Sequence, residues 1–382
     1  MKKRTLSVLL ALALTLTTSA YAQPSSNSNR VYVVKDNLSY VNMWGFSEGF
    51  SNVSRYADKD KLNEVHGLIN AVGNEVVSPK YHFMDNVSDG LVRVGMDTDN
   101  NNVTGTTYFG WGIDKYGFIN TQGKTIVPIS YARAEDFSEG LALVGTEYQY
   151  VQKGIQGFPS MTVTGNKIGF VDKNGKVVIP LAYDDAESFS EGLAVVTKGR
   201  KSGFIDKKGK VVIPLIYDDA KSFSEGLAAV SKNGKSGFIN AQEKIVVPLK
   251  YDFVGNFNEN FAMIGKDDKK GFINKRGQII VQPIYDNVDD FSEGLALVAQ
   301  AVNKDNGDYK YGFINQSGKV VIPLNFTSAS NFSDGLAIVK TTDELNKNYS
   351  VIDKSGKTKL HYKENTLEDF ENGISVIGKN TY

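Results

Sequence analysis

Residues 169–196 read GFVDKNGKVVIPLAYDDAESFSEGLAVV, residues 203–230 read GFIDKKGKVVIPLIYDDAKSFSEGLAAV, and residues 237–264 read GFINAQEKIVVPLKYDFVGNFNENFAMI. The glycines that open these stretches recur every 34 residues, and the first two 34-residue units are identical at 26 positions. Self-similarity at a fixed period is typical of repeat proteins, in which each unit buries its apolar face against its neighbours. The sequence therefore predicts one continuous array rather than several separate domains.

The unit at residues 202–230 indicates a β-rich repeat. Asp-Lys-Lys-Gly at 206–209 is a hairpin turn, and Ser-Glu-Gly at 224–226 is a second reversal. Pro214 is expected to end a strand, because proline has no N–H to donate. We expect three secure strands per unit and a weaker fourth near 216–218. The residues expected in the buried layer are Phe204, Ile205, Val212, Tyr217, Phe223 and Leu227.

Two signatures extend the array over most of the chain. Gly-Phe-Ile-Asp/Asn or a close variant opens units from Gly67 to Gly312, and Phe-Ser-Glu-Gly or a diverged form recurs from Phe46 to Phe370. Together they give about eight units. Three insertions fall at the same point of the repeat, before the next Gly-Phe-Ile. They are Met96–Tyr116, Glu147–Lys167 and Ala299–Tyr311.

The fold class predicted from these features is all-β, a tandem array of units of about 34 to 52 residues. Two architectures fit it. The first is an open β-solenoid or superhelix. The second is a closed β-propeller, in which Val31–Val34 lies near Ile374–Ile377 and seals the ring. Thirty-four residues are few for a four-stranded blade, which usually takes about 40, so the open array is favoured.

The N-terminus has the pattern of a secretory signal peptide. Lys2, Lys3 and Arg4 precede an apolar run at 6–16, and Ala20-Tyr21-Ala22 is a small-x-small cleavage pattern. We therefore expect a signal peptide at 1–22, a polar leader and first strand at 23–40, and the repeat array at 41–382. The expected location is the periplasm or the medium, and no later segment is apolar enough to cross a membrane.

The motifs resemble the bacterial WG-repeat family, also described as KWG repeats. The matching pattern is Gly-Phe-Ile-Asp-x-x-Gly-Lys-x-Val-Ile-x-Pro-x-Tyr-Asp followed by Phe-Ser-Glu-Gly-Leu-Ala, over about residues 40 to 380. The tryptophan that gives the family its name is absent from its usual place. That place holds Tyr116, Ile168, Ser202, Ser236, Lys270 or Tyr311. The resemblance implies a β-rich repeat fold and a binding or scaffold role, with no common enzymatic activity.

The composition argues against several function classes. Lys plus Arg and Asp plus Glu both number 43, so no net charge attracts nucleic acid. Cysteine is absent and the only histidines are His66, His82 and His361, so the sequence does not supply the several neighbouring ligands that a zinc site needs. No Gly-x-Ser-x-Gly elbow or phosphate-binding glycine loop occurs. We therefore expect no enzyme, no catalytic residue, no metal and no cofactor.

Recurring acids are the remaining candidates for chemistry. Asp184, Asp218, Asp252 and Asp286 follow a tyrosine, and a glutamate stands inside each Ser-Glu-Gly turn. Because a catalytic pair is singular, recurrence favours a role in shaping turns. The loop Asp97–Asn102 begins like a calcium loop but lacks its glycine and has Tyr108 where the bidentate glutamate belongs, so a solvated loop is favoured.

The insertions are the expected binding face, because insertions at one point of a repeat project from one side of the array. The candidate binding residues on them are Asp97, Asp99, Tyr108, Trp111, Tyr148, Tyr150, Phe158 and Tyr309. The expected partner is a protein. The alternative is a carbohydrate or cell-wall polymer, which needs an outward row of aromatics such as tyrosines 183, 217, 251 and 285.

Overall fold

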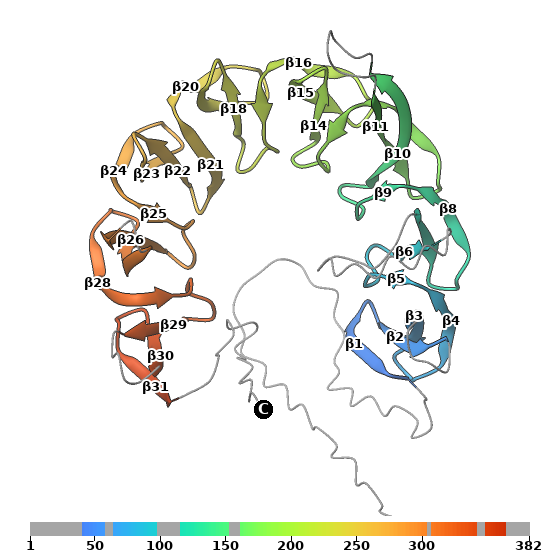
Figure 1. Cartoon of the computed structure of the whole chain (residues 1–382), viewed down its shortest axis with the longest axis horizontal. Coiled ribbons are helices and arrows are strands. Elements are labelled where there is room, and N and C mark those ends of the chain that lie inside the picture. Colours follow the sequence, from blue (N-terminus) through green and yellow to red (C-terminus); the bar gives the residue numbers. More distant parts are fainter. Residues whose placement is uncertain are drawn as a thin grey trace, which may run out of the picture.

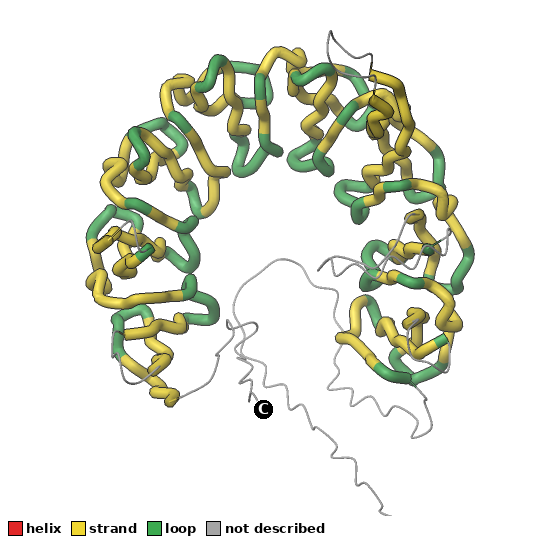
Figure 2. Tube along the Cα trace, in the orientation of Figure 1, coloured by secondary structure: helices red, strands yellow, loops and turns green. Residues whose placement is uncertain are grey.

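The computed structural model describes residues 40–57, 64–97, 115–152, 161–303, 307–341 and 348–363. Within these ranges the chain contains strands and loops and no helix (Figure 2). The strands form small antiparallel sheets that follow one another along an open arc (Figure 1). The all-β tandem array is thereby confirmed, and in the described part of the chain it is open.

Six of the described sheets contain four strands, here called inner, second, third and outer, and the seventh joins the last two units in seven strands. The row β24, β23, β22, β21 in Figure 1 runs from the convex rim to the concave side. The inner strands are β1(Asn42–Ser47), β5(Phe83–Met84), β9(Arg133–Ala134), β13(Asp185–Ala186), β17(Asp219–Ala220), β21(Phe253–Asn258) and β25(Asn287–Val288). The second strands are β2(Phe50–Tyr56), β6(Leu91–Met96), β10(Leu141–Gln152), β14(Leu193–Lys198), β18(Ala228–Lys232), β22(Phe261–Lys266), β26(Leu295–Asn303) and β29(Leu336–Thr341).

Except in the last described unit, the third strands carry the Gly-Phe-Ile motif or a close variant and the outer strands carry the proline. The third strands are β3(Glu64–Asn70), β7(Lys115–Asn120), β11(Met161–Asp172), β15(Lys201–Asp206), β19(Lys235–Ile239), β23(Lys269–Asn274), β27(Asp308–Asn315) and β30(Asn348–Asp353). The outer strands are β4(Glu75–Tyr81), β8(Thr125–Tyr131), β12(Val177–Tyr183), β16(Val211–Tyr217), β20(Ile245–Tyr251), β24(Ile279–Tyr285), β28(Val320–Ala329) and β31(Thr358–Lys363). The weak fourth strand anticipated near 216–218 is the two-residue β17, just beyond that position.

The hydrophobic core lies between sheets rather than within one. A single cluster joins Phe204 and Ile213 of one sheet to Phe223 and Val230 of the next. At its centre the rings of Phe204 and Phe223 meet edge to face, with centroids 4.9 Å apart. The same pair recurs at 4.7–4.9 Å as Phe118–Phe137, Phe170–Phe189, Phe238–Phe257, Phe272–Phe291 and Phe313–Phe332. The two phenylalanines of the repeat motif therefore hold neighbouring units together.

The glycine of Gly-Phe-Ile is required by a close approach of two strands. A Cβ on Gly203 would lie 2.6 Å from the Ile213 carbonyl oxygen and 2.7 Å from the Pro214 carbonyl carbon. No side chain fits at such distances without moving the backbone. The outer strand bulges here, because Ile205 faces Val211 whereas Phe204 faces Ile213.

This bulge corrects two sequence-based expectations. Val212 is the extra residue in the bulge and is 40% exposed, whereas Ile213 takes the buried position that the sequence had suggested for Val212. Pro214 does not end the strand, which continues to Tyr217. Because β16 is the edge of its sheet, the missing N–H of Pro214 removes no ladder bond, and the proline also discourages pairing with another edge.

Alternation of antiparallel strands gives each sheet two ends. The turns from inner to second strand and from third to outer strand lie at one end, the turn face. The hairpins from second to third strand and the Tyr-Asp connections to the next unit lie at the other end, the hairpin face. The final units are joined, because β28 continues into direct pairing with β29 and makes a seven-stranded sheet.

Candidate binding surfaces

The turn face is built from Ser-Glu-Gly-Leu turns with one geometry. Glu225 and Gly226 have φ of 53° and 86°, and Ser224 and Leu227 exchange both backbone hydrogen bonds. Positive φ at both central residues defines a type I′ turn, which matches the twist of the flanking strands. Glycine accepts this conformation freely, but glutamate rarely adopts it. A glutamate at that place therefore indicates a side chain that is needed there.

In six of the turns, the serine or asparagine and the glutamate bond to the turn of the following unit. Ser224 Oγ donates to the Phe257 carbonyl (2.7 Å), and the Glu225 carboxylate accepts the Asn260 N–H (2.9 Å). The equivalent serine or asparagine bonds are Ser47 to Val87, Ser138 to Phe189, Ser190 to Phe223, Asn258 to Phe291 and Ser292 to Phe332. The equivalent glutamate bonds are Glu48 to Gly90, Glu139 to Gly192, Glu191 to Gly226, Glu259 to Gly294 and Glu293 to Gly335.

Lysines from the third–outer hairpins reinforce this chain of turns. Lys207 Nζ lies 2.9 Å from Glu139, and this hydrogen bond holds the pKa of the Glu139 carboxyl below its usual range. Lys173–Asp89, Lys275–Glu225 and Lys354–Glu293 repeat the pair at 2.9–3.0 Å. The turn role expected for the recurring glutamates thus has an unexpected form, because their carboxylates bond the next unit rather than their own turn.

On the hairpin face, the aspartate after each repeat tyrosine has a similar double role. Asp218 accepts the Asn233 N–H of its own sheet's hairpin (2.6 Å) and pairs with Lys201 of the preceding sheet (2.5 Å). Asp184, Asp252 and Asp286 make the same two kinds of contact. These bonds hold the pKa of the Asp184 carboxyl low, chiefly through the Gly199 N–H.

The hairpin face nevertheless varies from unit to unit. His82 replaces the aspartate in the second unit and accepts the Asp97 N–H through Nδ1 (3.0 Å). Ala132 stands there in the third unit, and Thr327 stands there in the last, where it bonds the Lys340 carbonyl. Hairpin length varies as well. Between Lys198 and Lys201 only two residues intervene, whereas the matching pair Thr146 and Lys167 encloses residues 147–166.

The sequence-predicted binding residues are distributed over three of these hairpins. Tyr148 and Tyr150 are on β10, Tyr309 is on β27 with its ring 6.4 Å from that of Tyr311, and Asp97 is half-buried just after β6. Asp99, Tyr108, Trp111 and Phe158 lie outside the described residues. The hairpins that carry Asp97, Tyr148, Tyr150 and Tyr309 therefore lie on one face of the array.

The β10–β11 hairpin is the largest feature of that face. Its two strands pair without interruption from Leu141↔Asp172 to Gln152↔Met161. The neighbouring strands stop early, since β9 pairs only with Val144 and Gly145, and β12 reaches only Ile168. Beyond those points, among the described strands, both edges of the ribbon are unpaired. Unpaired edges carry N–H and C=O groups that another chain can pair with.

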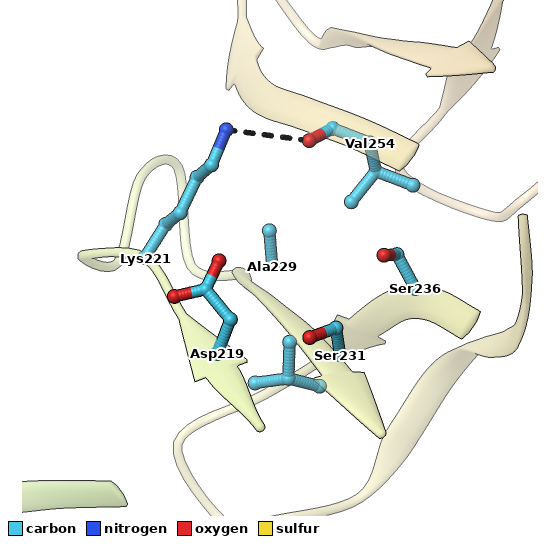
Figure 3. A pocket seen from close by; sticks show the side chains of 7 residues that line it. Asp219, Lys221, Ala229, Ser231, Ser236 and Val254 are labelled. Carbon is cyan, nitrogen blue, oxygen red and sulfur yellow. Dashed lines mark hydrogen bonds between the residues drawn. The ribbon is translucent and has the colours of Figure 1, made fainter. Parts of the chain in front are cut away.

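The concave side is lined by inner strands and by charged side chains. Between the β17–β20 and β21–β24 sheets, Asp219, Lys221, Ser231 and Ser236 surround a cavity of about 20 Å³, which is room for one water (Figure 3). Lys221 Nζ closes one side by bonding the Val254 carbonyl (3.4 Å). This cavity joins two units and is too small for a ligand.

Ion pairs cover the concave side of the N-terminal half. Arg93 contacts Asp85 (2.6 Å) and Asp136 of the next unit (3.5 Å), and Arg133 contacts Asp185 of the unit after that (2.8 Å). These pairs could not be recognised in the sequence, because the stacking of units brings together residues that lie far apart in the chain, such as Arg133 and Asp185.

A larger groove lies at the joint where β28 and β29 are fused. It has a volume of about 390 Å³ and is lined mainly by polar groups, including Asp289, Ser328, Asn331, Lys340 and Tyr349. Burial raises the pKa of Asp289 above its usual range. The groove is open and polar, which suits a peptide or another polar ligand better than an apolar one.

The tyrosines that would have formed an outward aromatic row are not available for one. Tyr217, Tyr251 and Tyr285 are 5%, 2% and 7% exposed, respectively. Only Tyr183 is half-buried, and it too packs against the inter-sheet core. The regular stacking surface required by the carbohydrate alternative is therefore absent at these positions.

Among the described residues, no three His, Cys, Asp or Glu side chains gather as a metal ion would require. Within the same part of the chain, no helix has the length and hydropathy needed to cross a bilayer.

The chain matches the model of the WG containing repeat at residues 67–97, 116–150, 168–201, 203–235, 237–269, 271–301 and 311–343. These segments cover more than half of the chain, so this protein belongs to the WG-repeat family. A search of curated protein sequences gave no match.

Several solved structures match parts of the chain at low sequence identity. A eukaryotic initiation factor is 12% identical, with a TM-score of 0.34, covering 78% of this chain and 94% of that one. Puromycin hydrolase is 10% identical, with a TM-score of 0.33, covering 85% of this chain and 54% of that one. TolB from Acinetobacter baumannii is 11% identical, with a TM-score of 0.28, covering 74% of this chain and 78% of that one.

Proposed function

We propose that this chain is a non-catalytic, exported binding or scaffold module whose partner is a protein, and that the partner binds on the hairpin face. The observation that carries the proposal is the β10–β11 ribbon with its two unpaired edges. An extended segment of a partner can add a strand to such an edge, with backbone bonds giving affinity and side-chain pockets giving specificity.

The contrast between the two faces supports this choice of surface. On the turn face the polar groups of each turn already bond the next unit, so few remain for a partner. The hairpin face differs among units in length and in side chains, as a surface adapted to one ligand does. The sheets that carry its loops are also held in place by the packing between neighbouring units.

The test is to shorten the ribbon to the form that the chain itself uses elsewhere. Residues 147–166 are replaced by Asn-Gly, so that Thr146-Asn-Gly-Lys167 copies Lys232-Asn-Gly-Lys235. The mature chain from Gln23 is used to capture exported proteins, and each captured protein is then purified and titrated by calorimetry. We expect the ribbon variant to lose at least about tenfold in affinity.

A matched control replaces residues 301–309 of the β26–β27 hairpin by Asn-Gly. This variant shortens a hairpin of the same face and is expected to retain partner affinity. Unchanged affinity after removal of the β10–β11 ribbon would show that the partner binds elsewhere, with the polar groove at β28–β29 as the next surface to mutate.

Export rests on the N-terminal residues 1–22, which lie outside the described part of the chain. The expected mature protein begins at Gln23. Mass spectrometry of the protein recovered from the periplasm or medium checks this. A chain that still begins at Met1 and stays in the cytoplasm would contradict it.

A further inference from the structure

The last described unit ends in an outer strand, β31, whose apolar residue lacks its usual cover. Leu360 on β31 is 50% exposed. It faces Val351 across the strand pair, as Ile213 faces Phe204. In the preceding units the equivalent residue is at most 5% exposed, namely Val77, Val127, Ile179, Ile213, Val247, Val281 and Ile322. In those units the next inner and second strands cover it.

The sequence after Lys363 contains the pieces that would provide this cover. Phe370 follows Gly356 by 14 residues, as Phe223 follows Gly209. The same register places Leu367 at the position of buried Ala220 and Ile374 at that of buried Leu227. Phe-Glu-Asn-Gly at 370–373 aligns with Phe-Ser-Glu-Gly without insertion or deletion. These residues lie outside the described ranges, so their register comes from the sequence alone.

We propose that the chain's own C-terminal segment, residues 364–378, docks on the β29–β31 face as the inner and second strands of a ninth unit. Phe370 then packs over Val351 and Leu360, in the way that Phe223 packs over Phe204 and Ile213. The segment acts as a cap. Repeat arrays need such caps, because an uncovered end face offers an apolar docking site to another copy.

The first sheet offers the competing docking site, and it defines the alternative. There Phe46 is 36% exposed, although its counterparts in later units are nearly fully buried, and Met43 and Trp44 beside it are 49% and 41% exposed. A C-terminal segment bound to β1 would close the arc into a ring. The exact spacing from Gly356 favours β29–β31, because it needs no long connection.

Hydrogen exchange followed by mass spectrometry on the mature chain tests the proposal. We expect peptides within 370–377 to exchange at least about a hundredfold more slowly than the free peptide. Leu360→Asp should bring that exchange to within about threefold of the free peptide, since a buried carboxylate has no partner there. Val321→Asp, on an outer strand position that is already 37% exposed, should leave it unchanged.

Two further variants keep the result decisive. Phe370→Asp changes the segment itself and should release both 370–377 and the protection of β31, even if Leu360→Asp disturbs the last sheet. Phe46→Asp should have no effect on 370–377. Exchange at the free-peptide rate in the unmodified chain would overturn the proposal. Protection that survives both Leu360→Asp and Phe370→Asp, or that is lost with Phe46→Asp instead, would overturn it as well.

Discussion

The turn face and the hairpin face of this array use the same kinds of bonds, but the turn face repeats them more regularly. A serine or asparagine of one turn reaches the carbonyl of the next at six of the seven described joints between Ser47 and Phe332, the exception being the joint that follows Ser88. On the hairpin face the corresponding aspartate is replaced by His82, Ala132 or Thr327. The difference indicates that one face maintains the arc and the other is free to change.

The largest expected effect comes from breaking the joint on which both faces depend. Phe204→Ala removes a ring that is fully buried and packed on Phe223, so we expect a loss of about 3–5 kcal/mol. The measurement is urea unfolding followed by circular dichroism. Val211→Ala, at a 45% exposed site, is the control and should change stability by less than about 0.5 kcal/mol. Equal effects of the two changes would contradict the inter-sheet core.

Ser224→Ala addresses the turn face alone and should have an intermediate effect. It removes the hydrogen bond to the Phe257 carbonyl, and we expect a loss of about 1 kcal/mol. The Asn-Gly replacement of residues 147–166 is the comparison on the hairpin face, and its melting temperature should not fall. If the serine variant melted like the parent protein while the shortened ribbon melted earlier, the roles assigned to the two faces would be reversed.

The ion pair between Lys207 and Glu139 predicts that the stability of the fold depends on pH. The pKa of Glu139 is lowered in the folded chain, so its stabilisation is complete above the unfolded value of about 4.3 and is lost as pH falls through the lower folded pKa. Glu139→Gln keeps an acceptor but removes the charge. It should lower stability at pH 7 by well under 1 kcal/mol, because the pair is partly exposed, and this difference should vanish in acid.

Glu191 provides the matched control for that measurement. It bonds Gly226 in the same way, but Ala241 stands where Lys207 serves Glu139. Thermal melts of both variants are measured from pH 3 to 8. At neutral pH, Glu139→Gln should therefore lower the melting temperature more than Glu191→Gln does, and in acid the two decreases should be equal. If the two variants lost the same stability at every pH, Lys207 would not be the cause of the pH dependence.

The smallest expected effect is an increase in stability. Ala241→Lys should supply the missing pair to Glu191 and raise stability by a few tenths of a kcal/mol, which is usual for an exposed pair. The gain should decrease in high salt, because ions screen exposed charges. Thermal melts at low and high ionic strength measure it. A gain that is independent of salt would point to packing by the lysine stem instead.

Most of the fold could be predicted from the sequence, because the same pattern of apolar and turn residues occurs in several units. Phe204, Ile205, Tyr217, Phe223 and Leu227 were placed correctly in the buried layer. Val212 was placed wrongly, because a bulge shifts the alternation of buried and exposed residues by one position. No residue type in this stretch indicates the bulge. Pro214 was assigned to a strand end, since its place at a sheet edge depends on tertiary structure.

The candidate surfaces were less predictable. The insertion positions showed that long hairpins share one face, because strand order fixes the end at which a hairpin lies. The partner of each glutamate was out of reach, because Glu225 and Asn260 are brought together by the stacking of units. The pairs of Arg93 and Arg133 were missed for the same reason.

The turn-to-turn bond has a consequence for how such a gene can change. The serine-to-carbonyl contact forms over 33 residues between Ser190 and Phe223 and over 51 residues between Ser138 and Phe189. Its geometry does not depend on the length of chain in between. Duplication by unequal crossing-over, or growth of one hairpin, therefore leaves each junction intact. Evolution can therefore add units or extend hairpins while the contacts between neighbouring units stay the same.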